Sequence, residues 1–578
     1  MRTVLACLLL VAGCTADTPA PSEAPKPPPT PGLAWRTKVP GNGYALVDGT
    51  VFAGSQGGVT AVEAKTGRTM WRFESPEGMN VVSWAVTGRA VTVAVDATKV
   101  TELDVEADWQ TIGLDAATGG RLWDIDREEL LPSLDYFAVE GPPVHLAASA
   151  GIVITPWYDD NGDSELVGVE ARTGAIAWST SLAELDFAGF SGCLVTVSDL
   201  TLEDLPLVVA DDTLAAVVAR CAQGRVVFGF DPRTGEPKWA TPIPPEQPGY
   251  LLMDHGVLVV TQFGPGTVLA ADGRVVYTGH LPPEQPVMAV VGDTVVVSGM
   301  AGTDDPLLGI DLRGGGVRWS LPRPSGDLPT NNLRRNGYRA MTASGDAVLG
   351  YRSSPGGTPD GLFLWANLLP VVVDSIDPAT GTIRSTPLTV TGLGEWFAVA
   401  DGTLLALTGN VLNAVPLTAG GAIEHTNAAA PIDRWPDPCE LLPAEQLEQW
   451  WPGRPPKPVG TPGTLLSQPL PHPIHCSYTD LDGSVPAMIT VDWTAADPQD
   501  AAALATSAHL ASAGLNADVE PKPLVPDIGT WAMRGNGEDS ITLHTGTVIV
   551  SAYSWDPAVP AVQLAKAVTA ELQALGYR

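Results

Sequence analysis

A short phrase that recurs along the chain constrains its fold more than any other feature. An acidic residue is followed four positions later by glycine and, in the clearest copies, eight positions later by a tryptophan. The acidic side chain can accept backbone N–H bonds and the glycine can adopt a positive φ, so the phrase predicts a tight, bulged turn between two strands. The clearest copies end in Trp71, Trp123, Trp178 and Trp239, and a weaker copy ends in Trp319.

The segments around the phrase complete a repeating unit of four short strands. β-branched runs such as Val295–Val297 precede the copies, often entered through a turn such as Asp48-Gly49. Weaker copies, including degenerate ones at 272–273 and 418–421, bring the count to eight. Because each repeat is too small to bury its own faces, we predict a mainly β fold with an eight-bladed β-propeller over residues 33–428, seven blades being the alternative. Residues 33–36 are expected to pair with 422–425 and close the ring.

The phrase resembles the repeat of the PQQ-like propellers, the family of quinoprotein dehydrogenases and BamB-type lipoproteins. In that family the tryptophans dock between neighbouring blades, so the resemblance implies a structural role for the five listed above. Quinoprotein dehydrogenases of this family carry an adjacent cysteine pair against the quinone, and this chain has no adjacent cysteines. A PQQ-dependent dehydrogenase is therefore disfavoured, and no cofactor is expected.

The chain begins with a lone arginine and an apolar stretch that ends at Cys14 after small residues. This pattern resembles a bacterial lipobox, with a signal peptide over 1–13 and lipidation at Cys14; an ordinary secretory signal is the alternative. Residues 14–32 are rich in proline and predict an extended spacer. We therefore expect a lipid anchor on the extracytoplasmic face of the cell membrane.

Residues 437–578 lack the phrase and alternate between helical and strand patterns, which predicts a smaller α+β domain. The opening D-P-C-x-L-L and a later C-x-Y strand resemble a lipoprotein domain of unknown function that is common in actinobacteria.

Four cysteines of the body favour two disulfides in an oxidising compartment. Cys193 and Cys221 are equidistant from the loop between two predicted antiparallel strands, which brings them together. Cys439 and Cys476 pair within the C-terminal domain. His472 and His475 beside Cys476 are assigned to a surface loop and not to a metal site.

One acidic segment is a candidate calcium site. Asp159, Asn161, Asp163 and Glu165 place oxygen ligands at alternate positions, as a calcium loop does. Ser164 replaces the usual glycine, and Glu170 at the twelfth position already belongs to a turn phrase. A solvated acidic hairpin is the favoured alternative.

The formal net charge of -33 disfavours nucleic acid as a partner and favours neutral or basic ones. No nucleophile-elbow, zinc-protease or phosphate-loop motif is present in the sequence. We therefore expect a non-catalytic binding or scaffold protein of the cell envelope that contacts a protein partner through propeller loops. A ligand-binding envelope sensor is the alternative.

Overall fold

The computed structural model describes residues 32–41, 43–96, 99–100, 105–106, 109–126, 146–158, 164–194, 208–244, 251–260, 265–281, 287–298, 306–321, 338–352, 356–357, 370–391, 396–408, 410–418, 421–465, 468–512, 521–535 and 539–578. Within these residues no helix is long and apolar enough to cross a membrane. Cys14 and residues 15–31 of the predicted spacer lie outside the described residues.

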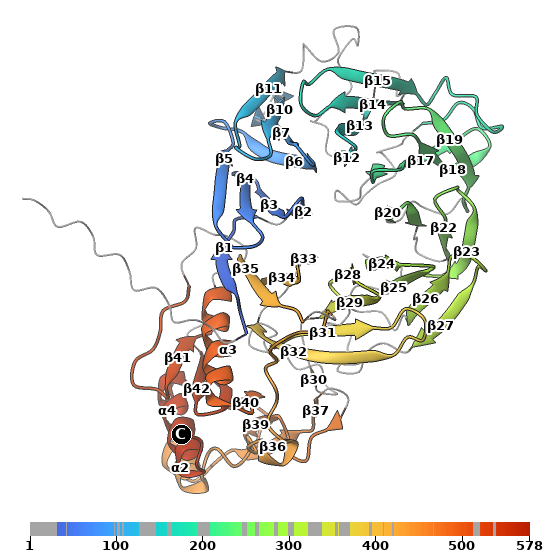
Figure 1. Cartoon of the computed structure of the whole chain (residues 1–578). Helices are drawn as coiled ribbons and strands as arrows, with labels where there is room; N and C mark the ends of the chain where they lie inside the picture. Colours follow the sequence, from blue (N-terminus) through green and yellow to red (C-terminus); the bar gives the residue numbers. More distant parts are fainter. Residues whose placement is uncertain are drawn as a thin grey trace, which may run out of the picture.

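The described residues form eight four-stranded antiparallel sheets, which follow one another around a ring (Figure 1). This confirms the prediction of a mainly β, propeller-like fold. The first four sheets contain β2 (Gly43–Val47), β3 (Thr50–Ser55), β4 (Gly58–Glu63) and β5 (Thr69–Glu74); β6 (Asn80–Thr87), β7 (Ala90–Asp96), β10 (Trp109–Asp115) and β11 (Arg121–Asp126); β12 (Ala147–Ser149), β13 (Ile152–Tyr158), β14 (Ser164–Glu170) and β15 (Ile176–Ser181); and β16 (Val208–Ala210), β17 (Ala215–Cys221), β18 (Gly224–Phe230) and β19 (Pro237–Pro242).

The other four sheets contain β20 (Leu251–Asp254), β21 (Val257–Val260), β22 (Pro265–Leu269) and β23 (Val275–His280); β24 (Val287–Val291), β25 (Thr294–Ser298), β26 (Leu307–Asp311) and β27 (Val317–Leu321); β28 (Ala340–Ser344), β29 (Ala347–Arg352), β31 (Pro370–Ile376) and β32 (Ile383–Thr391); and β33 (Trp396–Ala400), β34 (Thr403–Thr408), β35 (Val411–Pro416) and β1 (Trp35–Lys38). A separate pair joins β8 (Lys99–Val100) to β9 (Val105–Glu106).

The recurring phrase forms the turn between the third and fourth strands of a sheet. The strand register shifts beside Ala61, Gly113, Gly168, Gly229, Val268 and Gly309, each just before a turn. A bulge in the paired strands therefore lies beside the turn, in keeping with the bulged turn that the acid-to-glycine spacing predicts.

The partner predicted for the first strand is wrong. β1 pairs with β35, with Trp35 opposite Ala414, and not with residues 422–425. Ile423 instead forms an isolated bridge with Leu417, so the chain turns back after β35 without adding a fourth strand. The sequence marks residues 33–36 as a strand but carries no information about a partner at the other end of the chain.

The C-terminal unit is built on one six-stranded sheet in the order β36-β39-β40-β43-β42-β41. The small strand β37 (Thr464–Leu465) pairs with β38 (Gln468–Pro469) on one side and with β30 (Gly356–Gly357) on the other. The elements of the unit are η1 (Ile432–Arg434), α2 (Ala444–Trp450), β36 (Lys457–Thr461), β37 (Thr464–Leu465), β38 (Gln468–Pro469), β39 (His475–Thr479), β40 (Ala487–Thr494), α3 (Pro498–Ala511), β41 (Trp531–Arg534), β42 (Ser540–Thr545), β43 (Val548–Ser554) and α4 (Ala561–Ala574).

Residues before the predicted boundary at 437 already belong to the core of this unit. The N–H of Ala430 donates to the carbonyl of Thr494 at 2.7 Å. Trp435 is buried and meets Trp493 edge-on at 5.7 Å between ring centroids.

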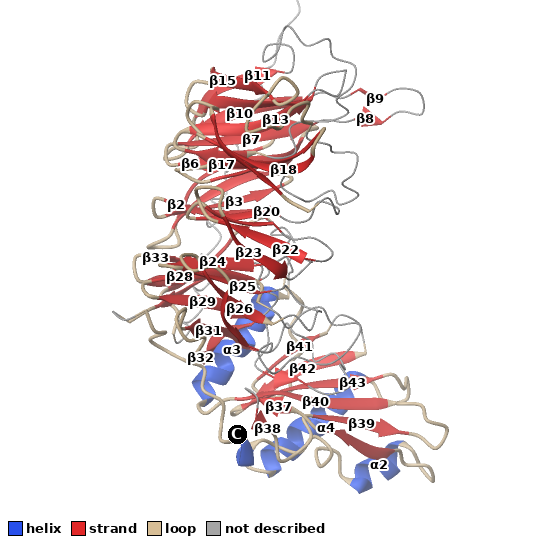
Figure 2. Ribbon diagram, turned by 90° about the vertical axis from the view of Figure 1, so that its right-hand side faces the viewer, coloured by secondary structure: helices blue, strands red, loops and turns tan. Residues whose placement is uncertain are grey.

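Helix α3 joins the unit to the ring by packing along β32 (Figure 2). The Thr391 N–H donates to Ser507 Oγ at 3.1 Å, and both groups are buried. Asn427 Nδ2 donates to the carbonyl of Asp500 at 3.3 Å, and His425 Nε2 lies 2.9 Å from Asp500 Oδ1. Buried polar groups paired across a junction favour a fixed arrangement over a flexible one.

Candidate functional site

The turn phrases are held by their acidic side chains. Asp115 Oδ1 accepts the Ala117 N–H at 3.1 Å, and the N–H and hydroxyl of Thr118 at 3.0 and 2.9 Å. These bonds, the Thr118 hydroxyl first, hold the pKa of Asp115 below its usual value. The pKa values of three more phrase residues are lowered mainly by backbone N–H donors, those of Arg233, Gly314 and Ala379 acting on Asp231, Asp311 and Asp377. These carboxylates therefore shape the turns.

The tryptophans of the phrases connect consecutive sheets. Each indole N–H donates to a backbone carbonyl in the phrase of the next sheet, 2.8 to 3.1 Å away. The pairs are Trp71 with Ala116, Trp123 with Ala171, Trp178 with Pro232, Trp239 with Ala271 and Trp319 with Pro378. The five residues thus act in docking between sheets, as the resemblance implies.

Glycines make room for these rings. A Cβ on Gly113 would lie 2.2 Å from the Trp123 ring, and one on Gly174 in the next sheet 2.9 Å from it. Gly174 also has φ +73°, which disfavours other residues. The indole therefore lies between two glycines of neighbouring sheets, which explains why the spacing of glycine and tryptophan recurs together.

The turns between the first and second strands lie on the same face of the ring as the phrases. The Ala64 N–H of a phrase donates to the carbonyl of Gly49, and the Leu417 N–H donates to that of Gly402, at 2.9 and 2.8 Å. Similar bonds join Ala171 to Gly151 and Leu312 to Asp293. We call this surface, made of the two sets of turns, the turn face.

We call the turns between the first and second strands the inner turns. They carry exposed carboxylates on consecutive sheets. Asp346 lies in the turn between β28 and β29, Asp401 in the turn between β33 and β34, and Asp48 in the turn between β2 and β3. All three side chains are exposed. Other inner carboxylates bind the neighbouring sheet: Asp254 Oδ2 accepts the Val290 N–H at 2.7 Å, and Asp211 accepts the Gly256 N–H. The exposed carboxylates therefore lie on turns of a ring whose neighbouring sheets are joined by hydrogen bonds.

The candidate calcium ligands are only partly visible. Asp159, Asn161 and Asp163 lie outside the described residues. Glu165 lies in β14, and its carboxylate accepts the Ser179 hydroxyl at 2.8 Å. Glu170 accepts the Thr173 hydroxyl of its own turn at 2.8 Å. Within the described part of the chain, no group of three His, Cys, Asp or Glu side chains could hold a metal ion.

The structure contains both predicted disulfides, Cys193–Cys221 and Cys439–Cys476. Leu194 forms an antiparallel bridge with Arg220, so Cys193 and Cys221 lie opposite each other, as the symmetric spacing predicts. The assignment of His475 to a surface loop is wrong. His475 lies in β39, is 1% exposed, and contacts the hydroxyls of Thr490 and Ser477 at 3.1 and 3.0 Å.

Three buried ionisable residues were not found by sequence reasoning. Arg352 Nε pairs with Asp374 Oδ2 at 2.8 Å, and the Tyr338 hydroxyl donates to the same oxygen at 2.7 Å. Asp492 is 2% exposed in β40 and accepts the Ser551 hydroxyl at 2.6 Å. The only signal in the sequence is an aspartate inside an apolar run, at Val371–Asp374 and at Ile489–Trp493.

Comparison with known proteins places the fold in a family. The family model described as "Outer membrane protein assembly factor BamB" matches residues 28–274 and 222–356. A search of curated proteins finds no match. Among solved structures, BamB from Moraxella catarrhalis is 15% identical, with 67% of this chain and 99% of that chain covered and a TM-score of 0.41.

Two further solved structures are among those similar to this chain. The quinohemoprotein alcohol dehydrogenase ADHIIG from Pseudomonas putida HK5 is 15% identical, covering 70% of this chain and 78% of that one, with a TM-score of 0.41. The computationally designed Ika8 protein is 13% identical, covering 67% and 98%, with a TM-score of 0.40. Since the family model matches more than half of the residues, the chain belongs to the family of the outer membrane protein assembly factor BamB.

Proposed function

We propose that this chain is a non-catalytic binding or scaffold protein of the cell envelope, held at the extracytoplasmic face of the membrane by a lipid on Cys14. The BamB family model and the lipobox-like start of the chain support this proposal. The ring would be an eight-bladed propeller closed by β1, and the pairing of β1 with β35 supports that closure.

The observation that carries the proposal is the set of exposed carboxylates on the inner turns. Asp48, Asp346 and Asp401 lie on three consecutive sheets at one face of the ring, where Asp254 and Asp211 bind the neighbouring sheet. Carboxylates fixed on one face attract positively charged surfaces and orient them during association. The partner we propose is an envelope protein with a basic surface, in keeping with the net charge of -33 on this chain.

Quinone chemistry is not part of the proposal. The adjacent cysteine pair that the resemblance implies for a quinone site has no counterpart here, because Cys193, Cys221, Cys439 and Cys476 form two disulfides between distant positions. The residues present therefore do not fit the cofactor. The phrase tryptophans are likewise occupied with the backbone of neighbouring sheets.

Site-specific photo-crosslinking in intact cells tests this function. A photoreactive residue at Asp346 samples the turn face, and one at Glu184 samples an exposed carboxylate beyond the other end of β15. We expect a defined crosslinked protein from position 346 and none of that size from position 184. Equal crosslinking from both positions, or none from position 346, would contradict recognition by the turn face.

A further inference from the structure

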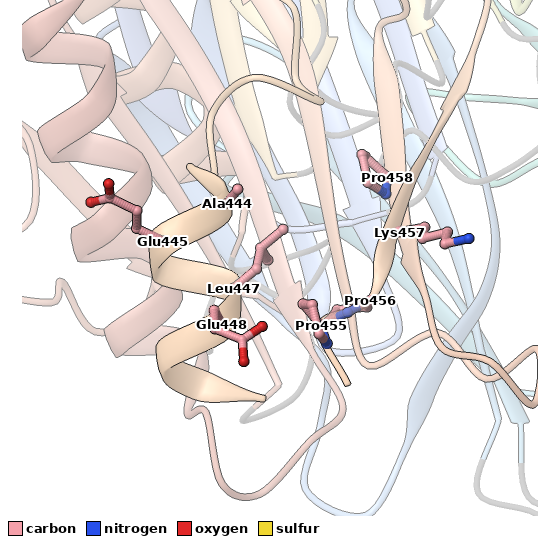
Figure 3. A pocket seen from close by; sticks show the side chains of 8 residues that line it. All are labelled: Ala444, Glu445, Leu447, Glu448, Pro455, Pro456, Lys457 and Pro458. Carbon is pink, nitrogen blue, oxygen red and sulfur yellow. The ribbon is translucent and has the colours of Figure 1, made fainter. Parts of the chain in front are cut away.

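The C-terminal unit carries a groove that is separate from the turn face. It lies between α2 and the segment that leads into β36, with a volume of about 720 Å³ (Figure 3). This volume falls within the range of pockets that bind small ligands and side chains. The groove is lined by Ala444, Glu445, Leu447, Glu448, Pro455, Pro456, Lys457 and Pro458.

Both walls of the groove are attached to the same strand. The chain just before α2 is bound to β39 through the Cys439–Cys476 disulfide, and the Tyr478 hydroxyl donates to the carbonyl of Pro438 at 3.1 Å. The opposite wall continues into β36, where Gly460 pairs with Cys476. A groove whose walls are fixed in advance binds a ligand with a smaller ordering cost.

The interior of the groove is apolar, and its rim on the helix side is acidic. Leu447 and Pro456 are buried, while Glu445 and Glu448 are exposed. Prolines lack an N–H, so the wall formed by Pro455, Pro456 and Pro458 offers no backbone donor at these positions. In Figure 3 the ammonium group of Lys457 points away from α2, and the carboxylate of Glu445 lies on the side of α2 away from the prolines, whereas Glu448 lies beside Pro455. A ligand therefore meets apolar surface flanked by hydrogen-bond acceptors.

We propose that this groove binds an arginine- or lysine-bearing segment of a partner protein. The aliphatic stem of such a side chain packs on Leu447 and Pro456, while its cationic end bonds to Glu448. Glu448 Oε1 also accepts the Gly453 N–H at 2.8 Å, which fixes one carboxylate in place and leaves its second oxygen for the ligand. This site is independent of the proposed function of the ring.

Charge argues against two other occupants. The spacer of this chain, residues 15–31, contains Asp17 and Glu23 against a single Lys26, so its net charge matches that of the carboxylates instead of opposing it. A second copy of the chain brings a formal net charge of -33. An acidic rim therefore favours both of them less than it favours a basic segment of a partner.

Fluorescence anisotropy on the full chain in detergent tests the proposal. The probe is a labelled peptide, acetyl-Pro-Leu-Arg-Leu-Arg-Pro-amide, compared with the same peptide carrying neutral citrulline in place of both arginines. We expect the arginine peptide to bind about tenfold or more tightly than the citrulline peptide, as charge-assisted hydrogen bonds imply. Equal binding of the two peptides would overturn the proposal.

Matched variants locate the site. Glu445→Gln with Glu448→Gln should weaken binding of the arginine peptide about tenfold, whereas Glu74→Gln with Glu77→Gln, the same charge change on the ring, should leave it unchanged. Wild-type affinity in the groove variant would overturn the proposal. A tenfold gain in affinity on deleting residues 15–31 would also overturn it, because the groove would then belong to the spacer. A dimer in sedimentation that is lost only in the groove variant would overturn it as well, because the groove would then bind a second copy.

Discussion

Asp492→Asn should change how the stability of the C-terminal unit depends on pH. Asp492 is 2% exposed; its Oδ2 accepts the Ser551 hydroxyl, and its Oδ1 has no hydrogen-bond partner. Burial raises the pKa of this carboxyl from 3.8 to about 7, against a smaller lowering effect of Ser551.

The sign follows from proton binding in the two states. Below pH 3.8 both the folded and the unfolded chain hold the proton, so the full stability is present. Between pH 4 and 7 only the folded state keeps the proton, and the free energy of unfolding falls by about 1.4 kcal/mol per pH unit. From 3.8 to about 7 the loss adds up to about 4 kcal/mol.

Asparagine is nearly isosteric and does not ionise, so the variant should lack this loss. We expect the free energy of unfolding of Asp492→Asn, relative to that of wild type, to rise by about 2 to 4 kcal/mol as the pH goes from 4 to 8. Urea unfolding measures this change, with the hydrogen exchange of β40 as a probe confined to the C-terminal unit. Asp433→Asn, at an exposed carboxylate of the same unit, is the control and should keep the wild-type slope. A wild-type slope in Asp492→Asn would refute the reasoning.

Three further perturbations test other parts of the account. Arg352→Met should lower the free energy of unfolding by about 3 to 5 kcal/mol, because it leaves Asp374 buried without its partner; adding Asp374→Leu should recover part of this loss in denaturant melts, and no recovery would contradict the pairing. Gly119→Ala should cost about 1 to 3 kcal/mol, since the new Cβ would lie 2.7 Å from the Trp71 ring at φ +69°; an unchanged melting temperature would argue against the docking of the indole. Cys14→Ser should release the chain from membranes or leave it unprocessed, and unchanged fractionation would exclude the lipid anchor.

The turns could be predicted from the sequence because each depends on residues only a few positions apart. The acidic residue and the glycine of a phrase belong to one hydrogen-bonded turn, as at Asp115 and Gly119, where the N–H of Gly119 donates to the carbonyl of Asp115 at 2.8 Å. The pairing of Cys193 with Cys221 was inferred from symmetric spacing, and the isolated bridge between Leu194 and Arg220 has that register, although the hairpin partner of β17 is β16. The geometry of such a turn depends on which residue types stand a few positions apart, so it can be inferred from their spacing in the sequence.

Contacts between distant segments could not be predicted in this way. The pairing of β1 with β35 joins the two ends of the ring, and nothing in the pattern of residues 33–36 distinguishes β35 from residues 422–425. The pair Arg352–Asp374 and the burial of Asp492 depend on how strands stack, which hydrophobic periodicity does not report. The groove beside α2 depends on the approach of a helix and a proline segment within the folded unit.

The most direct test of the central proposal is the loss of a partner when the inner carboxylates of the turn face are neutralised. Asp48→Asn, Asp346→Asn and Asp401→Asn remove three charges there, and asparagine tolerates the positive φ at positions 48 and 401. Glu74→Gln, Glu77→Gln and Glu184→Gln remove three exposed charges elsewhere on the ring. In quantitative co-purification from membranes, we predict that the protein crosslinked from position 346 is lost only with the first triple variant, at unchanged melting temperature and membrane fraction. Retention of that protein by the first variant, or equal loss from both, would contradict recognition by the turn face.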